Sequence, residues 1–308
     1  MTTEKKNNLV GSIMLMICAI VWGSSFVAQT TGAEYVGPFT FISLRSLLGS
    51  ISLIPVMLVL GAFRKKNTEE VIENKKGKKF FILSGIACGV CLTFASVLQQ
   101  MGIDKGTSPG KAGFITALYI LLVPVFSIAL KKKIRPLIWG CVAISLVGLY
   151  LLCVTDKSVQ LSDFYVLLCA ACYAVHILII DYVSPHVDGV KLSCLQFFVC
   201  SILAAIPMFV SEEVSFELIK AAAPSIAYSG IMSSGVAFTL QILGQQKMNQ
   251  PTVASMIMSL ESVFAVIFGM LLLSQIPTAR ESIGCILMFL AIIVAQLPER
   301  SLRNKVKS

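Results

Sequence analysis

Long apolar runs follow one another along almost the whole chain, and they constrain its fold more than any other feature. A run of about twenty residues, as a helix, crosses a bilayer core of roughly 30 Å. Inside hydrocarbon every backbone polar group needs a partner within the protein, and a helix supplies one. We therefore predict an all-α membrane protein with ten transmembrane helices, at residues 9–31, 38–61, 80–101, 112–130, 135–154, 162–181, 191–210, 221–243, 252–274 and 280–297.

The distribution of charge gives an expected orientation. Only 13% of the residues are charged, against about a quarter in soluble domains. If the N-terminus is cytoplasmic, most of the 25 Lys and Arg residues fall in cytoplasmic segments, as the positive-inside rule requires. We predict that both tails, 1–8 and 298–308, are cytoplasmic. The net charge of +9 then reflects topology, and no nucleic-acid partner is expected.

A motif that occurs twice indicates an internal duplication. The pattern Gly-Val-x-x-Thr-x-x-x-x-x-Gln-Gln lies at residues 89–100 and again at 235–246. The two copies lie in the third and the eighth predicted spans, an offset of five, so they should cross the membrane in opposite directions. Duplicated units of opposed topology are typical of transporters that alternate their access. We predict two inverted five-helix repeats, at 9–154 and 162–297.

Four further patterns occur in order along the spans. They are Trp-Gly-Ser-Ser-Phe at 22–26, Leu-Arg at 44–45, Gly-Phe-Ile-Thr-x-Leu-Tyr-x-x-x-Val-Pro at 113–124, and Ser-Leu-Glu-Ser-Val-Phe-Ala at 259–265. Together they resemble the EamA-type drug/metabolite transporter superfamily over nearly the whole chain. The last pattern differs from the family's pattern at Ser262, where the family usually has proline. Whether the helix is kinked at this position is therefore left open by the sequence.

The resemblance implies a fold and a class of function. It implies a helical bundle around a central cavity in the plasma membrane, and members mostly export amino acids or other metabolites. We expect a secondary transporter that exports small polar metabolites, amino acids foremost, by alternating access. One alternative is a nucleotide-sugar or phosphate-ester exchanger, which would need more intramembrane cations than Arg45. The other is a non-transporting membrane scaffold or a lipid flippase partner.

Enzymatic and metal chemistry are not predicted. We find no nucleophile–base pattern, zincin motif or Rossmann fingerprint, so the chain is not expected to be an enzyme or to hold a cofactor. The pairs Cys88-x-x-Cys91 and Cys169-x-x-Cys172 have zinc-like spacing. Because they lie at membrane depth, we interpret them as small packing residues and predict no metal site.

Two ionisable residues lie deep in predicted spans. Glu261 is about ten residues into its span, near mid-membrane. It can serve as a proton or substrate-amine site, or it can form a structural ion pair; we expect it to face the interior and pair with Arg45 or a Gln. Arg45 can bind a substrate carboxylate or phosphate, or it can clamp backbone carbonyls between helices.

Polar and aromatic side chains offer further candidates for the site. Gln241 and Gln245 share a helix face and can bond either a substrate or a neighbouring helix, whereas Gln99, Gln100 and Gln246 lie near span ends, where we expect an interfacial position. The aromatic and histidine candidates can line the cavity or fill the core. The full set of candidates is Trp22, Arg45, Tyr119, Tyr173, His176, Gln241, Gln245 and Glu261.

The expected partners are a small-molecule substrate and the lipid bilayer. Gly85-x-x-x-Gly89 is a close-packing motif. It can join helices within one bundle, or it can join two protomers of a homodimer, and the sequence leaves both open.

Overall fold

The computed structural model describes residues 3–66, 76–107, 109–132, 134–153, 160–248, 250–273 and 278–295. All regular elements in these ranges are helical. The tail expected at 298–308, and the ends expected for the spans at residues 154, 274 and 297, lie outside the described residues. In chain order the helices are α1 (Thr3–Ala33), α2 (Pro38–Lys66), α3 (Gly77–Asp104), α4 (Pro109–Ala117), α5 (Tyr119–Ala129), α6 (Pro136–Cys153), α7 (Leu161–Val183), η1 (Ser184–His186), α8 (Gly189–Ser211), α9 (Phe216–Tyr228), η2 (Ser229–Ala237), α10 (Phe238–Met248), α11 (Pro251–Met258), α12 (Glu261–Leu273) and α13 (Ala279–Ala295).

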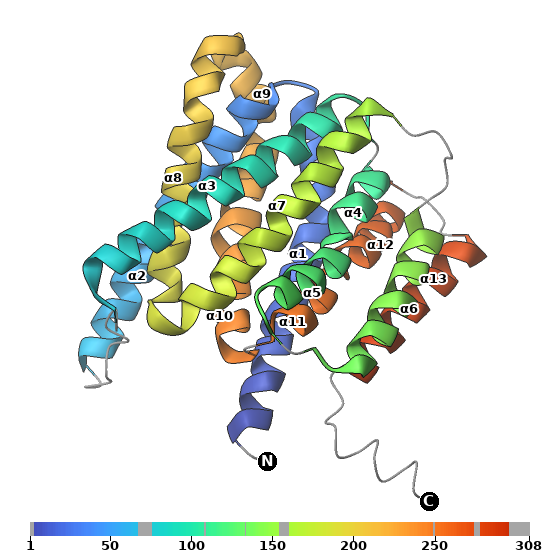
Figure 1. Cartoon of the computed structure of the whole chain (residues 1–308). Helices are drawn as coiled ribbons and strands as arrows, with labels where there is room; N and C mark the ends of the chain where they lie inside the picture. Colours follow the sequence, from blue (N-terminus) through green and yellow to red (C-terminus); the bar gives the residue numbers. More distant parts are fainter. Residues whose placement is uncertain are drawn as a thin grey trace, which may run out of the picture.

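The helices form one layered bundle, with α3 packed between α7 and α8, and with α6 and α13 paired at one edge (Figure 1). Eight helical stretches of the described chain are long and apolar enough to cross a membrane. The two remaining expected spans, 135–154 and 280–297, correspond to shorter apolar helices at 136–151 and 282–295. Helix α1 begins at Thr3, so the helix already includes most of the tail expected at 1–8.

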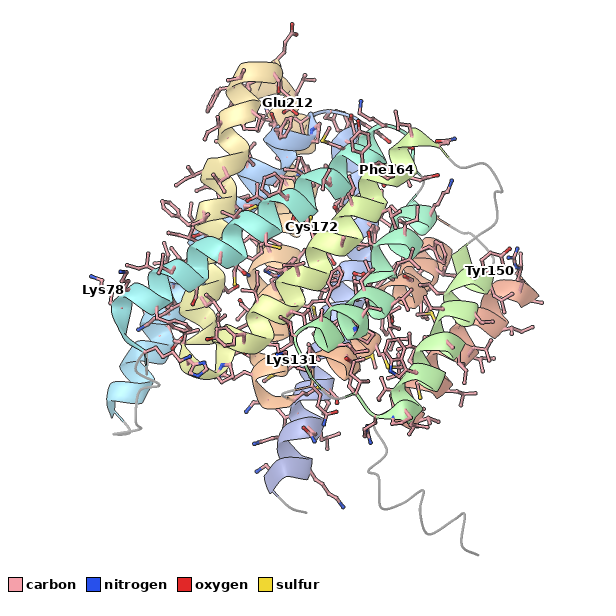
Figure 2. The ribbon with its side chains drawn as sticks, in the orientation of Figure 1. Lys78, Lys131, Tyr150, Phe164, Cys172 and Glu212 are labelled. Carbon is pink, nitrogen blue, oxygen red and sulfur yellow. The ribbon has the colours of Figure 1, made fainter. Side chains whose placement is uncertain are left out.

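The outer surface of the bundle carries large apolar side chains. Phe164 and Tyr150 are 54% and 52% exposed (Figure 2), and Val210 is 83% exposed. A soluble protein rarely leaves so much apolar surface in water, whereas hydrocarbon accepts it without cost. Together with the apolar helices, this surface describes a multi-pass membrane protein.

The fourth and ninth predicted spans are each broken in two. Helix α4 ends at Ala117 and α5 begins at Tyr119, while α11 ends at Met258 and α12 begins at Glu261. At both breaks the backbone makes tight bonds between residues three apart, such as Leu118 N to Ile115 O at 3.2 Å. Such turns interrupt an α-helix, and the sequence patterns predicted continuous spans instead.

The second break forms without the proline usual in the family. The Ser259 hydroxyl donates to Met256 O at 2.7 Å, and such local bonds compete with the helix ladder. The Ser262 hydroxyl donates to Gly113 O of α4 at 3.0 Å. Serine therefore links the two broken helices to each other at the position where proline would offer no donor.

The eighth predicted span contains a π-helix, η2, between α9 and α10. Its wide turns are visible in the backbone bond from Phe238 N to Ser233 O. Glycines let η2 touch α2 almost backbone to backbone: a Cβ added at Gly49 would lie 2.6 Å from Ser234 Cβ, and one at Gly230 would lie 2.9 Å from Arg45 O. This close approach fixes the part of α2 that carries Arg45.

Polar contacts join the two predicted halves near both ends of α7. Near its start, Asp163 accepts from Lys111 Nζ at 2.6 Å and from Thr107 Oγ1 at 3.1 Å. Near its end, Asp181 forms an ion pair with Lys132. Helix α7 runs from one end of the bundle to the other (Figure 1), so the halves are tied at opposite ends.

The small residues of α3 pack inside the bundle. A Cβ added at Gly89 would lie 2.6 Å from Val199 Cβ of α8, and one at Gly85 would overlap Leu195 of the same helix. The Gly85-x-x-x-Gly89 motif therefore joins helices of one chain. The Cys91 thiol donates to Cys172 O of α7 at 3.1 Å. Among the described residues these cysteines are free, and His, Cys, Asp and Glu do not gather in a group that could hold a metal.

Candidate functional site

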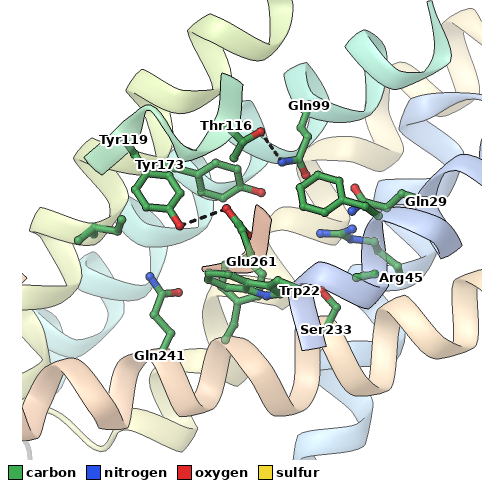
Figure 3. A pocket seen from close by; sticks show the side chains of 14 residues that line it. Trp22, Gln29, Arg45, Gln99, Thr116, Tyr119, Tyr173, Ser233, Gln241 and Glu261 are labelled. Atoms are coloured by element: carbon green, nitrogen blue, oxygen red, sulfur yellow. Dashed lines mark hydrogen bonds between the residues drawn. The ribbon is translucent and has the colours of Figure 1, made fainter. Parts of the chain in front are cut away.

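A narrow cavity of about 30 Å³ lies between the two predicted halves (Figure 3). Helices α1 to α5 supply one part of its wall, and α7, η2, α10 and α12 supply the other. The lining residues are Trp22, Ser25, Phe26, Gln29, Arg45, Gln99, Thr116, Tyr119, Tyr173, Ile177, Ser233, Phe238, Gln241 and Glu261. Six of the eight residues proposed from the sequence are in this set.

The two helix breaks meet in the cavity. Tyr119 is the first residue of α5, Glu261 is the first residue of α12, and the tyrosine hydroxyl donates to Glu261 Oε1 at 3.1 Å. Glu261 is 4% exposed and faces the interior, as expected. The expected partners, Arg45 or a glutamine, are replaced by Tyr119. The N-terminus of α12 carries a partial positive charge that favours an acidic side chain in its first turn.

Arg45 is 2% exposed, yet two of its guanidinium nitrogens have no hydrogen-bond partner among the described residues. Its Nε and Nη1 atoms are buried and donate no hydrogen bond to the part of the chain that the structure describes. Through these two atoms Arg45 neither clamps backbone carbonyls nor bonds a carboxylate there. Its Cζ lies 6.0 Å from the centroid of the Phe41 ring. Figure 3 shows the guanidinium directed into the cavity beside Gln29.

Other polar atoms of the cavity are also buried without a described protein partner. They include two donors or donor–acceptors, Trp22 Nε1 and Ser25 Oγ, and two acceptors, Gln29 Oε1 and Gln241 Oε1. A buried polar group left unpaired costs about 1–3 kcal/mol. With the two Arg45 nitrogens, six such atoms belong to residues that line this one space, so polar groups that enter it can bond to them.

The aromatic candidates divide between the cavity and the surrounding packing. Trp22 lines the cavity and also packs on Phe238, with ring centroids 4.6 Å apart. Tyr173 lines it too, with its hydroxyl 3.4 Å from Ser96 Oγ. His176 does not reach the cavity: it is fully buried and shares a 3.1 Å hydrogen bond with Gln196 Oε1.

The glutamines behave differently from one another. Gln241 lines the cavity, whereas Gln245, one turn later, donates to Ile177 O of α7 at 3.0 Å. The interfacial position expected for Gln99 and Gln100 stays a prediction, and both side chains are buried within the bundle. Gln99 donates to Thr116 Oγ1 at 3.0 Å, and Gln100 donates to the backbone of Gln29 at 3.2 Å. Gln246 is partly exposed.

Some cavity residues were not singled out from the sequence. Gln29 follows Trp22 by two helical turns, so the helix period carries a signal that would have placed both on one face. Thr116 lies in the sequence pattern at 113–124 but had no assigned role. Ser233 lies in η2, and the period of an α-helix does not place its side chain.

The curated relatives named below are described as uncharacterized transporters. The profile of the EamA-like transporter family matches twice, over residues 9–154 and 160–296. An uncharacterized transporter of Archaeoglobus fulgidus is 26% identical over 96% of this chain and 88% of its own length. The uncharacterized transporter YwfM of Bacillus subtilis is 23% identical over 94% of both chains. A solved structure described only as "Crystal structure of protein" shares the fold, with a TM-score of 0.76 and 18% identity over 97% of this chain and 99% of that one.

Proposed function

Because the chain belongs to the EamA-like transporter family, we propose that it exports small polar metabolites, amino acids foremost, by alternating access. It would act as a secondary transporter in the plasma membrane with both termini in the cytoplasm. Ten helices would cross the membrane, the eight long stretches together with the shorter α6 and α13. The two matched repeats would be related by an inverted topology.

The position of the helix breaks supports the inverted repeat. Tyr119 and Glu261 occupy corresponding positions, each at the start of the second half-helix in the fourth span of its repeat. Transporters of inverted topology typically place substrate sites where such discontinuous helices meet near the midplane. The hydrogen bond between these two residues brings both breaks to one point.

The cavity carries the proposal. It lies between the repeats rather than within either one, and several of its buried polar atoms lack described protein partners. A site between the repeats can open first to one side of the membrane and then to the other when one repeat rocks against its partner. The contacts of Asp163 and Asp181 with the first repeat, near opposite ends of α7, would open and close on opposite sides in turn.

The test is a counterflow assay in liposomes. Purified protein is reconstituted, the vesicles are loaded with one unlabelled L-amino acid at a time, and uptake of the labelled compound is measured. We expect transient accumulation for at least one amino acid and its loss in Trp22→Ala, with Trp139→Ala of α6 as the matched control outside the cavity lining. Imposed gradients of opposite sign give the preferred direction. Absence of counterflow for every compound, from protein that melts cooperatively, would contradict the proposal.

Phosphate-ester exchange remains a second candidate, because the incompletely paired Arg45 guanidinium is suited to a phosphate as well as a carboxylate. Nucleotide sugars and sugar phosphates therefore enter the same assay. Counterflow of these compounds alone would move the assignment to this alternative.

A further inference from the structure

We infer that Arg45 forms an anion subsite in the central cavity and binds the carboxylate of a zwitterionic ligand whose ammonium group lies at Glu261 and Gln241. The inference rests on the proposed function, and it deepens it by assigning opposite ends of the cavity to opposite ends of the ligand.

Arg45 lacks the partners that a purely structural arginine would need. A charge that is buried and uncompensated strongly destabilises a fold, and two of the guanidinium nitrogens are left without a described protein partner. Glu261, the acidic residue of the same cavity, bonds to Tyr119 instead. A guanidinium with two unpaired nitrogens can donate two parallel hydrogen bonds to the oxygens of a carboxylate.

The backbone around Arg45 is fixed, so the side chain cannot easily withdraw from the cavity. Its carbonyl oxygen lies within 2.9 Å of a Cβ added at Gly230, and one added at Gly49, a turn later, would meet η2 at 2.6 Å. Helix α2 therefore cannot move closer to η2, and substitution of either glycine would push the two apart. This packing holds the base of the Arg45 side chain at the cavity wall.

The hydrogen-bond donors and acceptors of the other lining residues lie in different parts of the cavity. Trp22 Nε1 and Ser25 Oγ add donors from α1, which suit an anion beside Arg45. Further from Arg45, Glu261 in the middle of the cavity and the unpaired Gln241 Oε1 on the far side offer acceptors, which suit an ammonium group. Figure 3 shows Arg45 on one side of the cavity, with Tyr119 and Gln241 on the other and Glu261 between them.

This arrangement favours a carboxylate over a phosphate ester. A zwitterion gives Arg45 and Glu261 one counter-charge each and adds no net charge to the cavity. A phosphate ester carries up to two negative charges and would set them against Glu261 with Arg45 as the only cation among the described lining residues. Like charges at this depth are strongly disfavoured.

The experiment measures binding and melting of the full chain in detergent, with chemically matched ligands. Each L-amino acid is compared with the amine that lacks its carboxylate, with the acid that lacks its amine, and with inorganic phosphate. The variants are Arg45→Gln and Arg45→Lys. Arg280→Gln is the charge-matched control, because Arg280 is exposed and lies over Tyr150, with its Cζ 5.3 Å from the ring centroid.

For the wild type we expect the amino acid to bind about tenfold to hundredfold tighter than its matched amine, the range that one hydrogen bond to a charged group gives. Arg45→Gln should remove this difference, while its melting temperature without ligand stays equal or rises. Arg45→Lys should recover part of the difference, since it restores charge but not the planar fork. Arg280→Gln should behave as the wild type.

Other outcomes overturn the subsite. Equal wild-type affinity for the amino acid and its amine does so without any variant. A lower ligand-free melting temperature of Arg45→Gln with unchanged affinity would also overturn the subsite, because it would make Arg45 structural. Binding of phosphate alone that depends on Arg45 would overturn it as well. Counterflow of ligands that lack a carboxylate would refute the subsite and leave the transporter standing. No counterflow of any compound would refute the proposed function, and the subsite with it.

Discussion

The hydrogen bond between the two helix breaks allows a quantitative test. Changing Tyr119 to Phe removes the hydroxyl that donates to Glu261 Oε1 at 3.1 Å and leaves the ring in place. A hydrogen bond to a charged group contributes about 1.5–3 kcal/mol, whereas polar bonds between membrane helices average only about 0.6 kcal/mol. Glu261 is 4% exposed, so water cannot readily replace the lost donor. We therefore expect a loss of about 1–2 kcal/mol, above the average for membrane helices.

The assay is thermal unfolding of detergent-purified protein without ligand. In a chain of this size about 1 kcal/mol corresponds to roughly 2 °C or somewhat less, so Tyr119→Phe should melt about 2–4 °C below the wild type. Tyr150→Phe, at an exposed position, should be neutral. A double-mutant cycle with Glu261→Gln isolates the pair, and we expect a coupling of at least about 0.5 kcal/mol. Additive effects of the two changes, or an unchanged melting temperature for Tyr119→Phe, would refute the reasoning.

Three further predictions follow from the packing and the charges. Gly23→Ala should greatly reduce the yield of folded protein, because the added Cβ would lie 2.8 Å from the main-chain oxygen of Glu261. Gly140→Ala, whose added Cβ would have nothing within 4 Å, should leave the yield unchanged. Equal yields of the two variants by size-exclusion chromatography would contradict this prediction. Asp163→Asn should weaken the ion pair with Lys111 and so speed thiol labelling of cysteine variants in the cavity, only from the side of the membrane where this ion pair lies. Faster labelling from both sides would argue against the ion pair as a gate of the cavity. Glu261→Gln should abolish the pH dependence of transport, and counterflow that keeps the wild-type pH profile would exclude Glu261 as the proton-coupling group.

Much of the architecture follows from simple patterns. Helical membrane segments are visible in the apolar runs because hydrocarbon leaves the backbone no other choice. Depth along a span placed Glu261 and Arg45 in the interior, where the structure has them. Their partners were beyond the sequence, because which side chains meet depends on the breaks at Leu118 and at Ser259, and neither break contains proline or glycine.

The duplicated motif misled in its details. In the first copy, within the regular helix α3, Gln99 reaches the cavity. In the second copy the glycine lies in η2, and the glutamine at the same spacing, Gln245, bonds the backbone of α7 instead. Equal spacing in sequence gives equal direction only when the helix geometry is the same, and a π turn changes the rotation between one residue and the next.

The π-helix η2 also identifies where the length of this chain can change in evolution. Deleting one residue from an α-helix such as α3 would rotate every later side chain of that helix by about 100° and turn its cavity face toward lipid. A wide turn holds a residue that an α turn would not need, so a deletion within residues 229–237 can be absorbed by tightening the turn. Helices α9 and α10 would then keep their faces. Among homologues, single-residue gaps in membrane segments should gather here.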